Sequence, residues 1–293
     1  MKVKYIITII IATVLLSIQS CSTKPQNNTP LITVTIEPLR FFAESIVGDK
    51  YTVVSMVPQG SSPETYDPTP QQLIDLSKSE LYLKIGHIGF ELTWMDKILN
   101  NIPNLNVVDT SNGIDLIRAT GHRHGDNYHE GGVETHVWNS TINAKIIAQN
   151  ILHAVIKLDN TNKAYYEQNY LALVKEIEKT DLQIKEALAN PNSNKGFLIY
   201  HPALSYFARD YGLLQVSIEE DGKEPTPAYL KKLINTCRAR DIHIIFIQPE
   251  FDQKNAEIIA KETQSKVIPI NPLAYNWKDE MINTAQTLGG LTY

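Results

Sequence analysis

The sequence predicts an α/β protein with two α/β domains, each containing a mostly parallel sheet, joined by one long connecting helix. Three observations support this prediction. Short β-rich runs alternate with helical patterns from Leu31 onward, an unusually long helical pattern follows, and the alternation then resumes. Strands that alternate with helices favour parallel sheets covered on both faces.

The first half of the chain contains four expected strands. They lie at 32–36, 51–57, 81–83 and 107–108, and a helix is expected at 41–47. After a polar stretch at about 111–135, the apolar spacing predicts a helix that ends near Leu158.

A second helix is expected from about Asn162 to Ala189, ending before Pro191. Its apolar residues recur along one side: Tyr166, Tyr170, Leu173, Ile177, Ile184 and Leu188. A helix of about 28 residues is about 42 Å long, more than the width of a small α/β domain. We interpret it as a stiff connector between domains, although periodicity alone also allows a long helix lying against a single core.

The alternation continues beyond this helix. Strands are expected at 197–200, 213–218, 242–247 and 267–270, and the run at 242–247 is apolar almost throughout. Such a run is typical of a strand that is covered on both faces.

The composition indicates a globular protein. The chain has 27 Lys and Arg against 32 Asp and Glu, a net charge of -5, and 43% hydrophobic residues. This balance argues against a disordered chain and against a nucleic-acid-binding surface.

The N-terminus has the pattern of a secretory signal. Lys2 and Lys4 precede an apolar run from Tyr5 to Ile18, which is too short to span a bilayer comfortably. The run ends in Ile18-Gln19-Ser20-Cys21, which resembles the lipobox of bacterial lipoproteins, whose cysteine carries the lipid. An ordinary signal peptide with an incidental cysteine is the alternative.

These features predict the organisation of the whole chain. It comprises a signal peptide at 1–20, a flexible polar tether at 21–30, an N-terminal domain at 31–158, the connecting helix at 159–190 and a C-terminal domain at 191–293. If Cys21 carries lipid, Cys237 has no partner within the chain, and we expect no disulfide.

Histidines are concentrated in the polar stretch before the expected helix. His122, His124, His129 and His136 fall within fifteen residues that also contain acidic side chains. This combination suits borderline metals such as zinc. Because the stretch is rich in glycine, we expect His122, His124 and His129 to form a weak, exposed metal-collecting loop rather than a preorganised site. A solvated loop without a function is the alternative.

His136 and His201 have more structured surroundings. His136 lies just before an expected helix, and His201 directly follows the expected strand at 197–200. The ends of parallel strands are where α/β folds place ligands. A histidine with a purely structural role explains either residue equally well.

Five short motifs or groups of motifs stand out along the chain. They are Gly60-Ser61-Ser62-Pro63-Glu64-Thr65-Tyr66-Asp67-Pro68-Thr69-Pro70, His136-Val137-Trp138, His201-Pro202-Ala203 with Tyr206-Phe207-Ala208 and Tyr211-Gly212-Leu213, Glu224-Pro225-Thr226-Pro227, and Asn271-Pro272-Leu273. In their order and spacing they resemble the motifs of a known family, the solute-binding proteins of zinc and manganese ABC importers. The resemblance covers nearly all of the chain from about Ile32. It implies two α/β domains joined by a long helix, with metal bound in the cleft between them.

The resemblance implies that the metal ligands are Glu64, His136, His201 and Asn271. The family commonly has His in place of Glu64 and often Asp in place of Asn271. The two changes together leave the charge of the ligand set at -1, which avoids an extra unpaired charge in the cleft. Asp67 is the nearest substitute for Glu64. Asn271 is a poor zinc donor, so it is alternatively expected to hold a water or to orient Glu64.

The sequence therefore predicts a lipid-anchored, exported receptor that faces the periplasm or the cell exterior. We expect it to capture Zn²⁺, or alternatively Mn²⁺, as a monomer, to deliver the metal to the membrane permease of an ABC importer, and to catalyse no reaction. A surface zinc hydrolase, a metal-independent adhesin and a receptor for siderophores or corrinoids are the alternatives. No HExxH motif supports the hydrolase.

Overall fold

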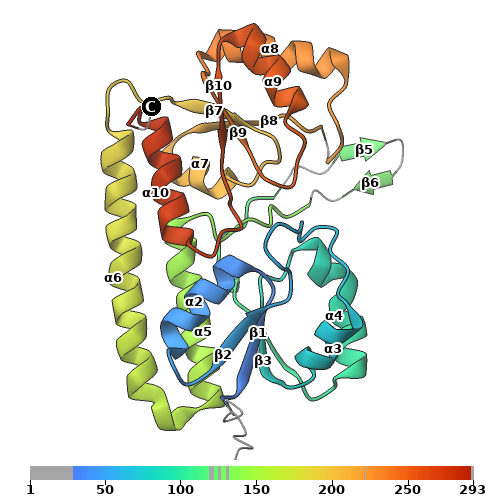
Figure 1. The fold of residues 1–293 in the computed structure, drawn as a ribbon, viewed down its shortest axis with the longest axis vertical. Helices are drawn as coiled ribbons and strands as arrows, with labels where there is room; N and C mark the ends of the chain where they lie inside the picture. The colour runs from blue at the N-terminus through green and yellow to red at the C-terminus, as the bar shows by residue number, and fades with distance from the viewer. Residues whose placement is uncertain (1–28, 119–121, 125–126, 130–131, 221, 292–293) are drawn as a thin grey trace, which may run out of the picture.

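A computed structural model describes residues 29–118, 122–124, 127–129, 132–220 and 222–291. The predicted signal peptide and Cys21 lie outside these residues. The architecture confirms the predicted class, because two sheets of parallel strands with helices are connected by one long helix (Figure 1).

The N-terminal lobe is built on a four-stranded parallel sheet with the order β2-β1-β3-β4. Its strands are β1 (Leu31–Val34), β2 (Thr52–Ser55), β3 (Ser79–Lys84) and β4 (Asn106–Asp109), and its helices are α2 (Glu37–Val47), α3 (Pro70–Leu76) and α4 (Gly89–Asn101). Helix α2 begins four residues before the predicted helix, because Pro38 in its first turn favours helix initiation.

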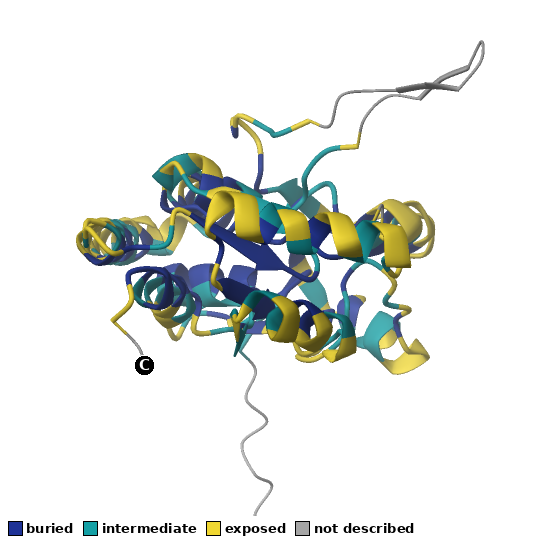
Figure 2. Ribbon diagram, turned by 90° about the horizontal axis from the view of Figure 1, so that it is seen from above, coloured by how far each residue is buried: buried dark blue, intermediate teal, exposed yellow. Residues whose placement is uncertain are grey.

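The C-terminal lobe has a second four-stranded parallel sheet, with the order β10-β9-β7-β8. Its strands are β7 (Gly196–Ile199), β8 (Leu214–Ser217), β9 (Ile244–Ile247) and β10 (Lys266–Pro269), and its helices are α7 (Ser205–Tyr211), α8 (Pro227–Arg240) and α9 (Lys254–Thr263). Seen from above, the buried strands lie between outward-facing helices (Figure 2). Cys237, on α8, is a buried free thiol.

Three helices connect the lobes. Helix α5 (Thr141–Leu158) leads through the short helix η1 (Asn160–Asn162) into α6 (Lys163–Leu188), and α10 (Trp277–Leu288) lies against α6 near the end of the chain. Helix α6 contacts α2 and α5 as well as α10, and Figure 1 shows it running along both lobes. Its predicted inner face is confirmed by the burial of Tyr166, Leu173, Ile177 and Ile184.

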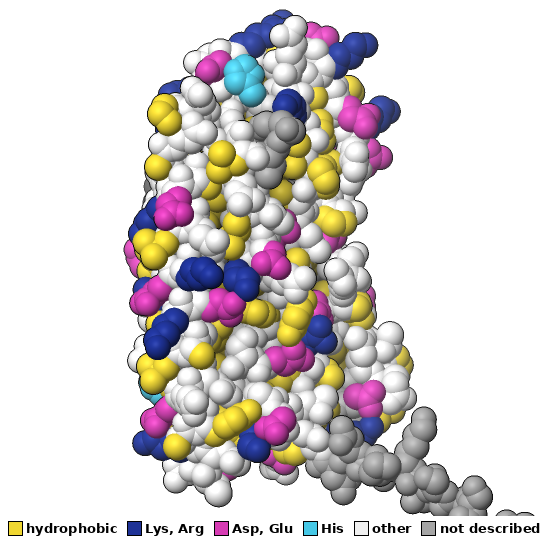
Figure 3. Space-filling model, turned by 60° about the vertical axis from the view of Figure 1, so that its left-hand side comes forward, with side chains coloured by type: hydrophobic (Ala, Val, Ile, Leu, Met, Phe, Trp, Pro, Cys, Tyr) yellow, Lys and Arg dark blue, Asp and Glu magenta, His cyan; other side chains and the backbone are white. Residues whose placement is uncertain are grey.

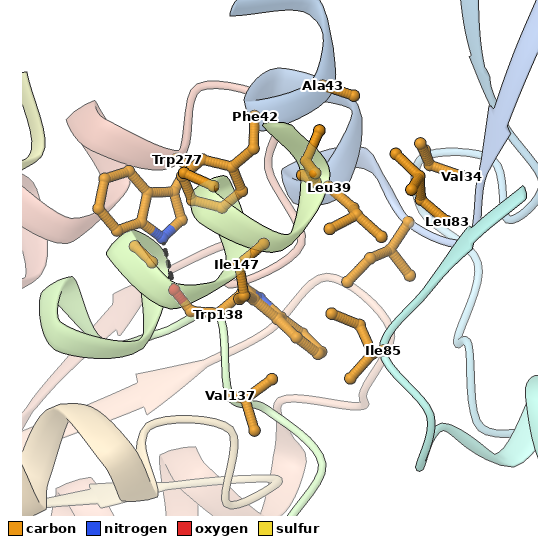
Figure 4. Close-up of a cluster of buried hydrophobic side chains, with 14 of the residues drawn as sticks. Val34, Leu39, Phe42, Ala43, Leu83, Ile85, Val137, Trp138, Ile147 and Trp277 are labelled. Carbon is orange, nitrogen blue, oxygen red and sulfur yellow. Dashed lines mark hydrogen bonds between the residues drawn. The ribbon is translucent and has the colours of Figure 1, made fainter. Parts of the chain in front are cut away.

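One hydrophobic core extends through both lobes. It includes Ile32 on β1, Trp138 before α5 and Phe246 on β9. Trp277 of α10 packs its ring 5.1 Å from that of Phe42 on α2, and its indole N–H donates to the carbonyl of Trp138 at 2.7 Å (Figure 4). The lobes are therefore joined by packing as well as by the connecting helix.

The histidine-rich stretch contains two short strands, β5 (His122–His124) and β6 (Asn127–His129). They pair antiparallel, with His122 opposite His129, and lie beside the main body in Figure 1. The side chains of His122, His124 and His129 are outside the described part of the structure, so the metal-collecting role stays a prediction.

Charges of both signs cover the outer side of α6 and its neighbours, as Figure 3 shows. They form pairs such as Lys163–Glu167 and Lys278–Glu176. Among the helices that the structure describes, none combines the length and the hydrophobicity that a membrane span requires.

Candidate metal centre

His136 and His201 meet at the junction of the two lobes, although 65 positions separate them in the sequence. Their Nε2 atoms are 3.2 Å apart, and their ring centroids are 5.0 Å apart. Two nitrogens bound to one tetrahedral zinc at about 2.0–2.1 Å would lie about 3.3 Å from each other. The spacing of the pair therefore suits two ligands of a single ion.

Each histidine is oriented by a carboxylate on its other nitrogen. His136 Nδ1 lies 2.5 Å from Glu134 Oε1, and His201 Nδ1 lies 2.9 Å from Glu219 Oε1. A carboxylate partner places the proton on Nδ1 and leaves the Nε2 lone pair free for a metal. Two facing lone pairs repel each other unless a proton or a cation lies between them, so the arrangement attracts positive charge.

The charges of the site favour a cation. Burial acts to lower the pKa of His201, but the hydrogen bond and charge of Glu219, with the charges of Glu64 and Glu134, raise it above its usual value. For Glu134, burial acts to raise the pKa, but hydrogen bonds and charge from His136 leave it lowered. The carboxylates thus stabilise positive charge on the His201 imidazole, and a divalent ion would be stabilised in the same way.

His136 is held mainly by the C-terminal lobe, although it precedes α5 in the chain. Trp138 Nε1 donates to the carbonyl of Pro272 at 2.7 Å, and Asn139 Nδ2 donates to the carbonyl of Ala203 at 2.9 Å. The Tyr206 hydroxyl donates to the carbonyl of Glu134 at 2.8 Å. These bonds fix the segment that carries His136 against the lobe that carries His201, so the pair is preorganised.

Glu64 comes from the loop between β2 and α3 and lines the same pocket as the two histidines. Its Oε2 accepts from the backbone N–H of Gly89 at 3.1 Å, and its Oε1 accepts from the Thr135 hydroxyl at 3.4 Å. The carboxylate therefore lies at the N-terminus of α4, where the helix dipole stabilises negative charge. Asp67 instead accepts from Trp94 Nε1 at 3.0 Å and does not line this pocket.

Asn271 has a different environment from the other three predicted ligands. Its Oδ1 accepts from the backbone N–H of Leu273 at 3.1 Å, and its own N–H donates to Glu280 at 2.6 Å. Pro272 and Leu273 line the pocket, whereas Asn271 is not among the lining residues. The structure thus brings Glu64, His136 and His201 to one pocket and places Asn271 beside it.

The pocket has an inner and an outer part. The inner part is about 30 Å³ and is lined by Glu64, His136 and His201, among others. The outer part, about 400 Å³, shares these three residues and is also lined by Glu134 and Glu219. The inner part has room for a single ion or one to two waters, whereas an organic ligand needs several hundred cubic ångströms.

In the part of the chain that the structure describes, no three His, Cys, Asp or Glu side chains already have the arrangement of a metal site. The histidine pair is in place, and at least one carboxylate must turn toward it to complete a ligand set. Glu64 is placed for this role, because it lines the same pocket as the histidine pair and bonds to Thr135, the neighbour of His136.

Sequence reasoning missed the orienting carboxylates. Glu134 is one of the acidic residues of the histidine-rich stretch, and neither it nor Glu219 is predicted from the sequence to contact a histidine. A signal was available for Glu134, which lies two residues before His136. Glu219 lies two residues after the end of β8, the strand that neighbours β7.

Comparison with known proteins supports the same interpretation. A family model described as the periplasmic component A of the zinc-uptake complex, ZnuA, matches residues 32–288. The chain belongs to this family. The ZnuA match spans both lobes and includes all four predicted ligands.

Relatives within the family are named for two metals. The high-affinity zinc uptake system protein ZnuA of Bacillus subtilis (strain 168) is 28% identical over 261 residues, which cover 85% of this chain and 80% of that protein. The manganese ABC transporter substrate-binding lipoprotein scaA of Streptococcus gordonii is 28% identical over 284 residues, covering 92% and 88%. A crystal structure of ZnuA superposes with a TM-score of 0.82 at 33% identity and covers 90% of this chain and 99% of that one.

Proposed function

We propose that the protein is an extracytoplasmic receptor that captures Zn²⁺, or alternatively Mn²⁺, between its two lobes and delivers it to the permease of an ABC importer. The observation that carries the proposal is the histidine pair, whose Nε2 atoms face each other at 3.2 Å while each Nδ1 contacts its own carboxylate. The names of the relatives from Bacillus subtilis and Streptococcus gordonii support the same two metals.

We infer that Glu64, His136 and His201 are ligands and that Glu134 and Glu219 orient the two imidazoles. We infer that Asn271 supports the pocket wall rather than binding the metal, because its amide oxygen accepts from the Leu273 N–H in the turn that places Pro272 and Leu273 in that wall. The proposed domain bounds, 31–158, 159–190 and 191–293, place the histidine pair at the domain junction.

Anchoring remains part of the proposal. We propose that Cys21 carries the lipid after removal of residues 1–20 and that a monomer meets the permease at the outer surface of the membrane. The relative from Streptococcus gordonii is named as a lipoprotein, which supports this location. Metabolic labelling with a tagged fatty acid should label the wild-type protein. The Cys21→Ala protein should stay unlabelled and be released from the membrane.

We propose further that the protein binds its metal without catalysing a reaction. The inner part of the pocket has room for an ion, and Glu134 and Glu219 contact imidazole nitrogens rather than standing free as bases. Zinc-loaded protein should hydrolyse esters, peptides and phosphates no faster than a buffer control containing zinc.

Metal titration tests the main proposal. We expect metal-free protein to bind one Zn²⁺ per chain. His136→Ala and His201→Ala should each weaken Zn²⁺ binding at least about 100-fold, because removing only a residue that hydrogen-bonds to a metal ligand already lowers metal affinity about 10-fold to 100-fold. His153→Ala, which changes a histidine on α5 away from the pocket, is the matched control. Equal affinity of all four proteins would refute the proposed site.

A further inference from the structure

We propose that Glu250 is the carboxylate ligand that the C-terminal lobe contributes to the metal, in the place where the family resemblance put Asn271. This inference rests on the proposed function, because it concerns the same metal. It follows from the position of Glu250 in the sheet, the construction of its turn, the lack of another partner for its carboxylate, and the charge of the site.

Glu250 lies at the point of the second sheet where ligands are expected. The chain runs from β7 outward to β8 and then returns to the other side of β7 to form β9, so the order of the strands reverses between β7 and β9. Open α/β sheets bind ligands beyond the carboxyl ends of the two strands at such a reversal. His201 follows β7 and Glu250 follows β9, so both flank this position.

The turn that carries Glu250 is built directly against His201. The side-chain amide of Gln248 donates to the carbonyl of His201 at 2.6 Å and accepts from its backbone N–H at 3.3 Å. The Phe251 ring stacks on the His201 ring, with centroids 5.5 Å apart. Because the residues on both sides of Pro249-Glu250 contact His201, Glu250 is held beside the imidazole.

The turn itself has a fixed conformation. The Phe251 N–H donates to the carbonyl of Gln248 at 3.2 Å, which closes a four-residue turn with Pro249 in its second position. Proline is preferred at this position because its ring restricts φ. The backbone of Glu250 is therefore constrained, and its side chain only has to choose a rotamer that points to the histidine pair.

The carboxylate of Glu250 is available for a metal. Glu250 is half-buried and lines the inner pocket together with Glu64, His136 and His201. Within the described chain, no hydrogen bond or ion pair involves its side chain, whereas Glu134 and Glu219 are bound to the imidazoles. A cation in the pocket would give this carboxylate a partner.

Asn271 is less suited to the same role. Its amide oxygen is already bonded to the Leu273 N–H, and it does not line the pocket. Zinc and manganese both prefer a carboxylate to a neutral amide. Glu250 thus offers the better donor in the better position.

The charge of the site also favours Glu250. With two neutral imidazoles, Glu64 and Asn271 give a ligand charge of -1, and Glu64 and Glu250 give -2. The additional negative charge attracts a divalent ion more strongly, and it adds to the attraction of Glu134 and Glu219 behind the imidazoles.

Competitive titration of metal-free full-length protein with Zn²⁺ and with Mn²⁺ tests this assignment. The variants are Glu250→Gln, Asn271→Ala and His201→Ala, and Glu257→Gln is the matched control because it is an exposed glutamate on α9 of the same lobe. We expect Glu250→Gln to weaken Zn²⁺ binding at least about 10-fold. It should weaken Mn²⁺ binding by a larger factor, because manganese depends more on oxygen donors. The metal affinities of Glu257→Gln and Asn271→Ala should stay within about threefold of the wild type. That change is well below the effect of losing a residue that only hydrogen-bonds to a metal ligand.

The result distinguishes this inference from the proposed function. One outcome is that His201→Ala binds metal more weakly while Glu250→Gln binds it as tightly as the control, Glu257→Gln. In that case the receptor assignment stands and Glu250 is not a ligand. If Asn271→Ala loses more affinity than Glu250→Gln, the assignment of Glu250 is also overturned. An altered visible spectrum of the Co²⁺-loaded Glu250→Gln protein, with an unchanged unfolding midpoint of the metal-free protein, supports direct coordination over a structural role.

Discussion

His136 and His201 present the same atom to each other, and each is backed by its own carboxylate. The two rings are held at a spacing that suits two ligands of one ion, because Glu134 and Glu219 each bind the Nδ1 atom of one ring and so direct its Nε2 atom toward the other. At the scale of single residues, the selectivity of the site for a cation thus comes from acidic side chains that need not touch the cation.

Glu219 should therefore control metal affinity from outside the ligand set. We expect Glu219→Gln to weaken Zn²⁺ binding about 10-fold, because the neutral amide orients the His201 ring less strongly and withdraws negative charge from it. Glu220→Gln is the matched control, since Glu220 is the exposed neighbour of Glu219. Calorimetric titration measures both constants, and equal affinities of the two variants would show that Glu219 has no orienting role.

The sequence predicted the two histidines of the pair better than the residues around them. His136 and His201 carry family motifs and lie at element boundaries, and these features are visible without coordinates. Glu219 and Glu250 were missed because an acidic residue after a strand is ordinary on any surface. Only burial and neighbours distinguish them, and both depend on contacts between segments that are distant in the chain.

Among the secondary-structure elements, the N-terminus of α4 is the support for Glu64. The backbone N–H groups of Gly89 and Phe90 donate to the Glu64 carboxylate and to the Pro63 carbonyl. A Cβ atom at Gly89 would lie 2.4 Å from the Glu64 carbonyl oxygen and 2.9 Å from its Oε2. Glycine at position 89 is therefore what permits the loop to approach the helix so closely.

Gly89→Ala should displace Glu64 and weaken metal binding. We expect about a 10-fold loss of Zn²⁺ affinity, comparable to the loss of a positioning contact. Gly132→Ala provides the control, because a Cβ atom there would meet nothing within 4 Å. Direct titration compares the two variants, and a Gly89→Ala protein that binds zinc as tightly as Gly132→Ala would show that the close approach is not needed.

Glu91 supports the same end of α4 from inside the core. Its Oε1 accepts from the Thr35 hydroxyl at 2.5 Å and from the Ile85 N–H at 2.8 Å, and its Oε2 accepts from the Gly86 N–H at 2.5 Å. Burial raises the pKa of the Glu91 carboxyl, although these hydrogen bonds and Lys84 act to lower it. The carboxyl is thus harder to ionise in the folded protein than in the unfolded chain.

This shift predicts how stability depends on pH. A raised folded pKa contributes stability that is complete below the unfolded pKa of about 4.5 and is lost as the pH rises through the folded value. The free energy of unfolding of the metal-free wild type should therefore fall, relative to Glu91→Gln, between pH 4.5 and neutral pH. Glutamine at position 91 also loses the contact with Gly86, but this loss changes the free energy of unfolding by the same amount at every pH. The prediction is therefore tested by how the difference in free energy of unfolding between the two proteins changes with pH.

Urea unfolding at several pH values measures this slope. Glu186→Gln is the control, because Glu186 is exposed on α6 and its substitution should leave the difference from the wild type nearly constant. A Glu91→Gln protein whose difference from the wild type does not change with pH would contradict the prediction.

At the scale of the whole molecule, one hydrophobic core is shared by the two lobes, and a second cluster that includes Leu198 and Ile245 belongs to the C-terminal lobe alone. The sequence predicted two domains and a connecting helix from alternation and periodicity, and the helix is present. The shared core was not predicted, because Trp138 and Trp277 reach it through contacts between segments more than 130 residues apart. The alternative of a long helix lying against a single core thus describes part of the packing, since α6 contacts helices at both ends of the molecule.

A shared core limits how the lobes respond to metal. Because α10 packs against α6 and its Trp277 contacts Phe42, the C-terminal lobe cannot melt without exposing apolar surface of the N-terminal lobe. We expect the metal-free protein to unfold in one cooperative thermal transition that is the same by tryptophan fluorescence and by far-ultraviolet circular dichroism.

Zinc should raise the midpoint temperature of this transition and leave it a single transition. At a free concentration of about 100 times the dissociation constant, binding stabilises the folded state by about 2.7 kcal/mol, which corresponds to about 5–10 °C for a chain of this size. His201→Ala should show almost no shift at the same zinc concentration, which separates binding at the site from nonspecific effects. Two transitions, of which zinc moves only one, would mean that the lobes fold independently and that metal in the junction does not join them.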